Sequence, residues 1–115
     1  MCSENTLRML LQEATCGLKE IFGEQLDCVI LYGSYARGDY NEDSDIDLMA
    51  LVDMDGAKLS EYRRRVNAFS NRLDLKHDVL LSIRLQDKET FTRWAGILPF
   101  FKNVIKDGIR IDGAA

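Results

Sequence analysis

The feature that most constrains the fold of this chain is a pair of short apolar runs, Cys28–Tyr32 and Leu48–Val52. They are the longest core-like runs in the sequence, and neither approaches the roughly 20 apolar residues that a membrane-spanning helix needs. Each run is therefore expected to form a buried strand that other elements must cover. Amphipathic helical patterns flank the runs, at Thr6–Phe22 and Leu59–Leu73, and they can provide that cover.

Turn and capping residues complete the order of elements. Asn5 or Ser3 can cap the first helix, and Gly23 is expected to end it. The predicted elements are a helix at Thr6–Phe22, a strand at Cys28–Tyr32 closed by Gly33, a polar turn at Asp39–Ser44, a strand at Asp45–Val52, a helix at Leu59–Leu73, a strand from about His77 to Ile83, helices at Lys88–Ala95 and Pro99–Asp107, and an extension at Ile109–Ile111. This order predicts a single α/β (α+β) domain over residues 1–115, with a small mixed sheet flanked by helices.

Charge and cysteine content exclude several classes of protein. The chain has 115 residues, with 15 Lys or Arg and 19 Asp or Glu, so its formal net charge is −4. Proteins that coat phosphates usually carry the opposite sign, which disfavours nucleic acid as a partner. Cys2, Cys16 and Cys28 are odd in number and form no Cys-x-x-Cys pair, so we predict neither a disulfide framework nor a Cys-rich zinc site. We expect a cytoplasmic protein with no signal peptide and no membrane partner.

Two acidic residues at the start of the second strand indicate chemistry. Alternate side chains of a strand share a face, so Asp45 and Asp47 point the same way while Ile46 and Leu48 point into the core. Two carboxylates about 4 Å apart repel by roughly 4 kcal/mol at an effective dielectric constant of ~20, so a cation is expected beside them. Mg²⁺ binds one or two protein carboxylates and completes its shell with water and substrate phosphates, which predicts a catalytic magnesium site.

A glycine and a serine after the first strand suggest a phosphate-binding turn. Gly33 lets the backbone approach a ligand with no Cβ in the way. Ser34 then offers a hydroxyl and a backbone N–H at the expected start of a helical turn, where anions are attracted. Arg37 can add a forked cation, either to a phosphate or to the acidic turn that follows.

Taken together, the segments Gly33–Gly38 (Gly-Ser-Tyr-Ala-Arg-Gly) and Ser44–Leu48 (Ser-Asp-Ile-Asp-Leu) resemble the signature of the DNA polymerase beta-like nucleotidyltransferase superfamily. The short chain and the Ala-Arg-Gly form are most similar to its minimal nucleotidyltransferase (MNT) branch. That family has a third carboxylate on a later strand, which Asp78 within Lys76–Leu81 would supply.

The resemblance implies a metal-dependent transfer of a nucleoside monophosphate to an acceptor hydroxyl, with ATP as donor and AMP as the transferred group. It implies that Asp45, Asp47 and Asp78 are catalytic and hold two Mg²⁺ ions, and that Gly33 and Ser34 bind the triphosphate. Proteins of this kind commonly pair with a small helical HEPN-type protein, often a ribonuclease toxin, and attach AMP to one of its tyrosines. The resemblance therefore implies the antitoxin of a HEPN/MNT toxin–antitoxin pair and leaves self-association open.

Two other functions stay open at the level of the sequence. One is an antitoxin-like binding module that acts by complex formation without catalysis, and the other is an aminoglycoside-type transferase that modifies a small molecule. Three converging carboxylates favour catalysis over binding alone. The two short helices after Asp78 leave little chain to enclose a small acceptor, which favours an acceptor on a partner protein.

The alternating acids of residues 39–47 also resemble a calcium loop. Counted from Asp39, however, the sixth residue is Ser44, where an EF-hand needs Gly. The twelfth is Ala50, where an EF-hand needs Glu. The calcium-binding alternative is therefore disfavoured.

Other conspicuous residues are expected to have structural roles. His77, the only histidine, should point away from Asp78 and serve the fold or the surface. The run Arg63–Arg65 predicts the solvent-exposed side of a helix. The aromatic residues Trp94, Phe100 and Phe101 are expected in the core, with some of them at an interface as the alternative.

Overall fold

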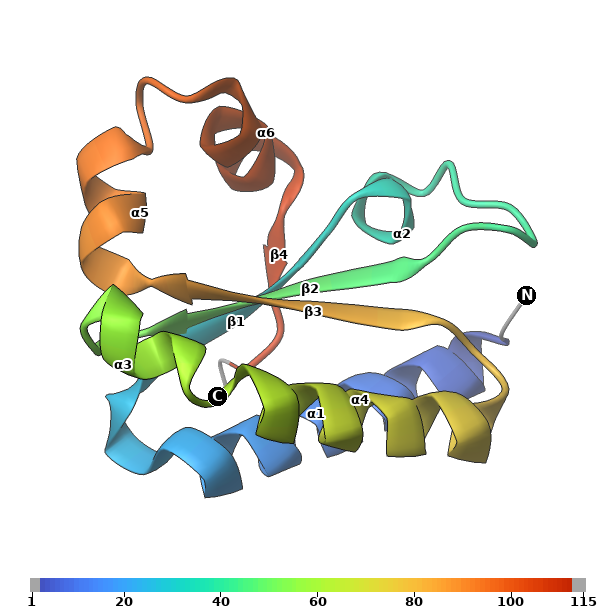
Figure 1. Cartoon of the computed structure of the whole chain (residues 1–115). Coiled ribbons are helices and arrows are strands. Elements are labelled where there is room, and N and C mark those ends of the chain that lie inside the picture. The colour runs from blue at the N-terminus through green and yellow to red at the C-terminus, as the bar shows by residue number, and fades with distance from the viewer. Residues whose placement is uncertain (1–2, 113–115) are drawn as a thin grey trace.

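A four-stranded sheet forms the centre of the computed structural model, which describes residues 3–112 (Figure 1). Its strands are β1 (Leu26–Tyr32), β2 (Ile46–Val52), β3 (Leu81–Asp87) and β4 (Ile109–Arg110). They lie in the order β3-β2-β1-β4. β2 pairs in parallel with β3, and β1 pairs antiparallel with both β2 and β4. The prediction of a small mixed sheet is confirmed.

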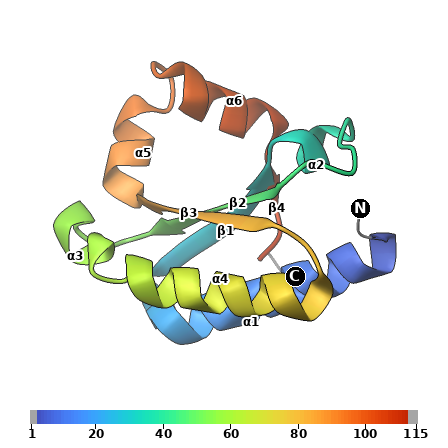
Figure 2. The same cartoon turned by 45° about the vertical axis from the view of Figure 1, so that its right-hand side comes forward.

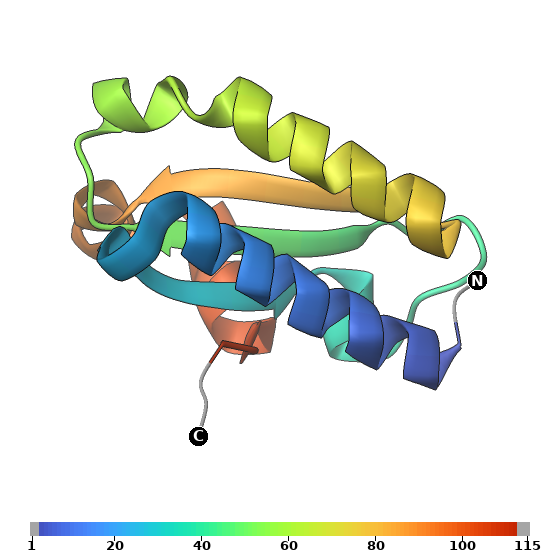
Figure 3. The same ribbon diagram turned by 90° about the horizontal axis from the view of Figure 1, so that it is seen from below.

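Helices cover both faces of the sheet. The helical segments are α1 (Glu4–Phe22), the 3-10 turn η1 (Gly23–Gln25), α2 (Ser34–Arg37), α3 (Gly56–Ser60), α4 (Arg63–His77), α5 (Lys88–Trp94) and α6 (Pro99–Asp107). α1 and α4 lie side by side across one face, which we call the lower face (Figure 3). α5 and α6 lie on the opposite face, the upper face (Figure 2). Within residues 3–112, no helix combines the length and the apolar character needed to span a membrane.

α1 forms as its sequence pattern predicts, and Ser3 is its cap. The Ser3 hydroxyl accepts a hydrogen bond from the N–H of Thr6 at 3.1 Å, which satisfies one donor of the first turn. The buried side of the helix consists of Leu10, Ala14, Thr15, Leu18 and Phe22. Gly23 ends the helix with a φ of 59°, and its N–H donates to the carbonyl of Lys19.

Two apolar clusters lie on the two faces of the sheet. The lower-face cluster joins α1 and α4 to the strand residues Val29, Leu31, Ile46, Leu48, Ala50 and Val52. The upper-face cluster consists of Cys28, Met49, Leu51, Phe91, Phe101 and Val104. β2 gives alternate side chains to each cluster, so both of its faces are buried, as expected for a strand in the middle of a covered sheet.

The structure corrects the predicted strand from His77 to Ile83. α4 continues to His77, and β3 begins only at Leu81 and runs to Asp87. The connection is fixed by Asp74, whose side chain accepts a hydrogen bond from the N–H of Leu81 at 2.7 Å. The predicted helix at Leu59–Leu73 is likewise divided into α3 and α4.

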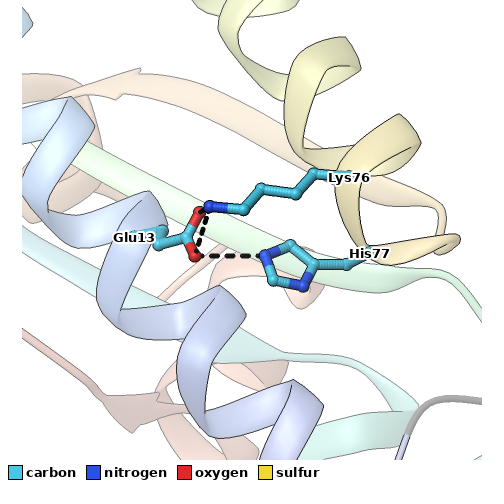
Figure 4. A network of polar contacts seen from close by, with 3 residues as sticks. All are labelled: Glu13, Lys76 and His77. Carbon is cyan, nitrogen blue, oxygen red and sulfur yellow. Dashed lines mark hydrogen bonds and ion pairs between the residues drawn. The ribbon is translucent and has the colours of Figure 1, made fainter.

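His77 joins the two helices of the lower face (Figure 4). Its Nε2 lies 3.3 Å from Oε1 of Glu13, and Nζ of Lys76 lies 3.1 Å from both oxygens of the same carboxylate. The hydrogen bond from Lys76 is the main cause that lowers the pKa of Glu13. His77 links α4 to α1, which confirms its predicted structural role.

Candidate active site

Asp45 and Asp47 stand at the beginning of β2. Asp45 immediately precedes the strand, and Asp47 pairs with Tyr32 at the end of β1. Ile46 and Leu48, on the other side of β2, are 1% and 0% exposed within the lower-face cluster. The predicted alternation along this strand is confirmed. It directs the Asp47 side chain to the upper face, toward the side of α5 and α6.

The charge of Asp47 is poorly compensated. Burial raises the pKa of Asp47, the negative charge of Asp45 raises it further, and the positive charge of Arg37 partly offsets both effects. The ionised carboxylate is thus held at an energetic cost, as expected where two like charges approach. A divalent cation at the pair would remove that cost, and the hard oxygen ligands fit Mg²⁺ with water and phosphate as its further ligands.

Gly33 brings the end of β1 against this carboxylate. Its φ is 75° and its ψ is −157°, a conformation that residues with a Cβ rarely adopt. A Cβ at Gly33 would also collide with Oδ2 of Asp47. Glycine is therefore required at this position for two reasons, the backbone conformation and the close approach to Asp47.

The short helix α2 follows directly and carries Ser34 and Arg37. Its first intrahelical hydrogen bonds run from the N–H groups of Ala36 and Arg37 to the carbonyl of Gly33, both at 3.1 Å. Ser34 is thus the first residue of the helix and directly follows Gly33. The Arg37 side chain forms an exposed ion pair with Asp39 at 3.2 Å, close enough to Asp47 for its charge to act there.

The expected convergence of three carboxylates is not found. Asp78 is the residue that ends α4, with a left-handed φ of 54°, and it is not part of any strand. Among residues 3–112, no three His, Cys, Asp or Glu side chains lie together in a group that could hold a metal ion. Asp78 lines a separate hollow of about 300 Å³ with Glu42, Asp43 and Ser44.

Ser82, Arg84 and Gln86 are the residues of β3 that share the upper face with Asp47. The register pairs Asp47 with Ser82 and Met49 with Arg84, and paired residues of a sheet lie on the same face. The Arg84 guanidinium carbon lies 4.6 Å from the ring centroid of Phe100, a cation–π contact. The position that faces Asp47 from the neighbouring strand is therefore a hydroxyl, with a guanidinium two residues further on.

Tyr32 and Phe100 complete the upper-face surroundings, and sequence reasoning did not assign either to the site. Their rings meet edge to face, with centroids 5.6 Å apart. Burial raises the pKa of Tyr32 and the charge of Asp47 raises it further, while Arg84 lowers it. The sequence does carry a signal for Arg84, because this charged residue lies between the apolar residues Ile83 and Leu85, as in a strand with one apolar face. Phe100 comes from α6 and gives no local signal.

A hollow of about 210 Å³ lies beside the Gly33 turn. Its lining residues are Tyr32, Gly33, Arg37, Phe100, Asn103, Val104 and Asp107. Its lining combines the aromatic residues Tyr32 and Phe100 with polar residues of α2 and α6. A planar group attached to a phosphate could occupy it, with the phosphate at the Gly33–Ser34 turn.

Comparison with known proteins identifies relatives along most of the chain. A family model described as "Polymerase beta, Nucleotidyltransferase" matches residues 17–111. Two proteins of Methanocaldococcus jannaschii, each named "Putative protein adenylyltransferase", are similar in sequence. One is 33% identical over 101 residues, which cover 85% of this chain and 90% of that protein. The other is 40% identical over 73 residues, which cover 64% of this chain and 72% of that protein.

Solved structures agree on the fold. A crystal structure described as a "putative nucleotidyltransferase" from Sulfolobus solfataricus has a TM-score of 0.59 and 22% identity, covering 93% of this chain and 82% of that one. A structure described as a toxin–antitoxin with AMP-PNP has a TM-score of 0.50 and 20% identity, covering 88% of this chain and 72% of that one.

Proposed function

The chain belongs to the polymerase beta-like nucleotidyltransferase family, and we propose that it transfers AMP from ATP to a hydroxyl group of a partner protein, where the hydroxyl oxygen attacks the α-phosphorus, gives up its proton and displaces pyrophosphate. The observation that carries the proposal is the close approach of the Gly33 backbone to the half-buried carboxylate of Asp47, next to Asp45. In this proposal the turn at Gly33 binds phosphate and the nearby carboxylate oxygens bind the metal, and nucleotidyl transfer requires both features side by side.

Asp45 and Asp47 are the proposed ligands of Mg²⁺. Their oxygens are hard donors, and the uncompensated charge of Asp47 favours a cation. Mg²⁺ bound there would neutralise the phosphates and lower the pKa of the acceptor hydroxyl. Because no third acidic residue joins this pair among residues 3–112, Asp78 is left outside the proposed metal site, and a second ion lacks a complete set of protein ligands.

The Gly33 turn and its hollow form the proposed nucleotide site. The hydroxyl and backbone N–H of Ser34 would hydrogen-bond the phosphates, and Arg37 would add a positive charge. The hollow of about 210 Å³ suits the nucleoside, with Phe100 for stacking against the base and the Asn103 amide for its polar edge. The AMP-PNP named for the toxin–antitoxin neighbour is an ATP analogue, which supports ATP as the donor.

Three observations support a protein as the acceptor. Both similar M. jannaschii proteins are named for protein adenylylation. The net charge of −4 disfavours a polyanionic acceptor. Large apolar side chains are exposed along α5, α6 and their connection, where a partner could cover them: Trp94, Ile97, Leu98, Phe100 and Ile105. Phe101, by contrast, is only 4% exposed and belongs to the core, as expected from the sequence.

The proposed partner is a small helical HEPN-type protein modified on a tyrosine, and this chain would act as its antitoxin in the cytoplasm. Free thiols at Cys16 and Cys28 agree with a reducing compartment. Incubation of both proteins with labelled ATP and Mg²⁺, followed by mass spectrometry of the partner, tests the proposal. An AMP adduct on a tyrosine supports it. A tight complex without an adduct would favour the binding module, and a labelled aminoglycoside with an unmodified partner would favour the small-molecule transferase.

Nucleotide binding offers a separate test. Ser34→Ala should weaken ATP binding by about 1–3 kcal/mol, because it removes one hydrogen bond to a charged phosphate. Calorimetry should also show that EDTA weakens ATP binding to the unaltered chain. ATP affinity that is insensitive to EDTA would argue against a metal held between the carboxylates and the phosphates.

A further inference from the structure

The outer edge of β3 is an open strand edge. β3 is the terminal strand of the sheet, and its inner side pairs with β2. The N–H of Ile46 donates to the carbonyl of Leu80 at 2.8 Å, which fixes which residues of this segment face β2. Backbone groups of successive residues point to opposite sides of a strand, so Ser82 and Arg84 face β2 while Leu81, Ile83 and Leu85 face outward.

Side chains of α4 form hydrogen bonds with the outward backbone groups of Leu81, but not with those of Ile83 or Leu85. The N–H of Leu81 donates to Asp74 at 2.7 Å, and the carbonyl of Leu81 accepts from the hydroxyl of Ser70 at 3.0 Å. Within residues 3–112, no side chain or further strand hydrogen-bonds the outward backbone of Ile83 or Leu85. Unpaired backbone groups in a row are a template for another strand.

A groove of about 540 Å³ follows this part of the edge. Residues of α3, α4 and β3 line it. In the view from below, α3 and α4 run beside β3 (Figure 3). Its lining includes Arg63, Ile83, Arg84, Leu85 and Asp87. An extended segment that pairs with Ile83 and Leu85 would therefore lie in this groove.

The charges of the groove favour an acidic occupant. Arg63 and Arg84 both line it, and neither has an ion-pair partner in the described part of the chain. The one carboxylate in the lining, that of Asp87, already accepts hydrogen bonds from the N–H of Thr90 at 2.9 Å and from Gln86 at 3.2 Å. A second copy of this chain on a two-fold axis would bring the guanidinium groups of both copies together, which disfavours self-pairing.

We propose that the β3 edge binds an extended acidic segment of the acceptor protein as an additional strand of the sheet. The proposal rests on the proposed function for the identity of the partner. Arg84 connects the groove to the active site, because it lines the groove and also lies over Phe100 on the upper face. Main-chain pairing along Ile83–Leu85 would give affinity, and Arg63 would select acidic side chains.

The test uses ¹⁵N-labelled protein and a synthetic peptide of alternating glutamate and valine with one central tyrosine. Binding should shift the amide signals of Ile83 and Leu85 most and slow their hydrogen exchange, because these N–H groups gain partners. The amides of Ser82 and Arg84 already face β2 and should change less. A matched peptide with lysine in place of glutamate should not bind. Equal binding of the two peptides, no binding of the acidic one, or shifts confined to another surface would overturn the proposal.

The arginine run provides a matched pair of variants. Arg63→Glu should weaken binding of the acidic peptide about fivefold, since an attraction becomes a repulsion. Arg65→Glu changes the net charge equally, but Arg65 is exposed and is not among the residues that line the groove, so affinity should be retained. Equal weakening by both variants would show that only net charge matters and would contradict a docking site at this edge.

Peptide binding also separates this proposal from the proposed function. Asp47→Asn should retain peptide binding while losing AMP transfer. Peptide binding at Ile83 and Leu85 without any AMP transfer by the unaltered chain would refute the function and leave the docking site intact. Transfer to a partner protein that is unaffected by Arg63→Glu would refute the docking site alone. Concentration-dependent shifts of the same two amides without peptide would show self-association and overturn the acidic occupant.

Discussion

The two faces of the sheet differ in how completely helices cover them. On the lower face, α1 and α4 have 19 and 15 residues and cover side chains that are fully buried, among them Leu18 and Leu48. On the upper face, α5 and α6 have 7 and 9 residues, and Phe100 is still 38% exposed. The burial that stabilises the fold is concentrated below the sheet, while the groups suited to chemistry stand in the less completely covered layer above it.

β2 contributes side chains both to the stabilising core below the sheet and to the candidate site above it. Leu48 points down into the lower-face cluster, and its neighbour Asp47 points up beside Gly33. Substitutions of adjacent residues should therefore affect different properties of the protein. If the lower face provides stability and the upper face provides activity, each property can be removed without the other.

The largest expected effect is on the upper face. Asp47→Asn should reduce AMP transfer about 10³-fold, because the proposed metal ligand loses its charge. The free energy of unfolding should stay the same or rise at neutral pH, since the substitution removes a partly buried charge and its repulsion from Asp45. Radiolabel transfer and urea unfolding measure the two effects. A loss of stability as well as activity in Asp47→Asn would contradict the separate roles of the two faces.

Leu48→Ala should do the opposite. Removing a side chain with 0% exposure from the lower-face cluster should cost about 2–5 kcal/mol of unfolding free energy. In conditions where the variant is still folded, its affinity for ATP with Mg²⁺ should be close to that of the unaltered chain. Urea denaturation and calorimetry on the same preparation test this. A large loss of ATP affinity in the folded variant would mean that the two faces are coupled.

Two glycines of the upper site offer a sharper comparison. Gly33→Ala and Gly38→Ala both place a Cβ at positive φ, 75° and 85°. Gly38 is in the left-handed helical region, so its substitution should cost about 1–2 kcal/mol in stability, and Gly33→Ala should cost more. Only the Cβ at Gly33 would collide with Asp47, whereas the Cβ at Gly38 meets nothing within 4 Å. AMP transfer should thus fall much further in Gly33→Ala. Equal activities of the two variants would show that the close approach to Asp47 has no role in transfer.

The smallest expected effect is a difference in pH dependence between the faces. Glu13 on the lower face has a lowered pKa, so its stabilising contribution is complete above the unfolded value of 4.5 and is lost as pH falls through the lower folded value. Asp47 has a raised pKa, so it costs stability above its folded value and ceases to do so in acid. Glu13→Gln should cost about 0.2–1 kcal/mol at neutral pH and flatten the acid limb below 4.5. Asp47→Asn should stabilise only at higher pH. Unfolding curves across pH measure whether each variant is more or less stable than the unaltered chain. A change in the same direction for both variants at neutral pH would contradict the opposite pKa shifts of Glu13 and Asp47.

Features set by local rules could be predicted from the sequence. The alternation of Ile46 and Leu48 with Asp47 follows from the two-residue period of a strand, and the helical stripe of α1 follows from its spacing. The glycine at the end of the first strand predicted a point where the backbone lets a ligand approach closely. These parts of the fold and of the site depend on neighbours in the chain.

Features set by tertiary contacts could not be predicted. α4 continues past the expected start of the strand because Asp74 bonds to Leu81, and this moves Asp78 out of β3. The pairing of Asp47 with Ser82 joins two residues that have 34 others between them in the sequence. Arg84 meets Phe100 only because α6 returns over the upper face.

The most direct test of the central claim compares Asp47→Asn with Asp78→Asn in AMP transfer to the helical partner, using labelled ATP and Mg²⁺. The structure sets Asp47 against Gly33 on the upper face and Asp78 at the end of α4. Asp47→Asn is therefore expected to abolish labelling, whereas Asp78→Asn, a change at an exposed residue, should keep it within about twofold. A folded Asp78→Asn protein that is as inactive as Asp47→Asn would contradict the account and restore a site of three carboxylates.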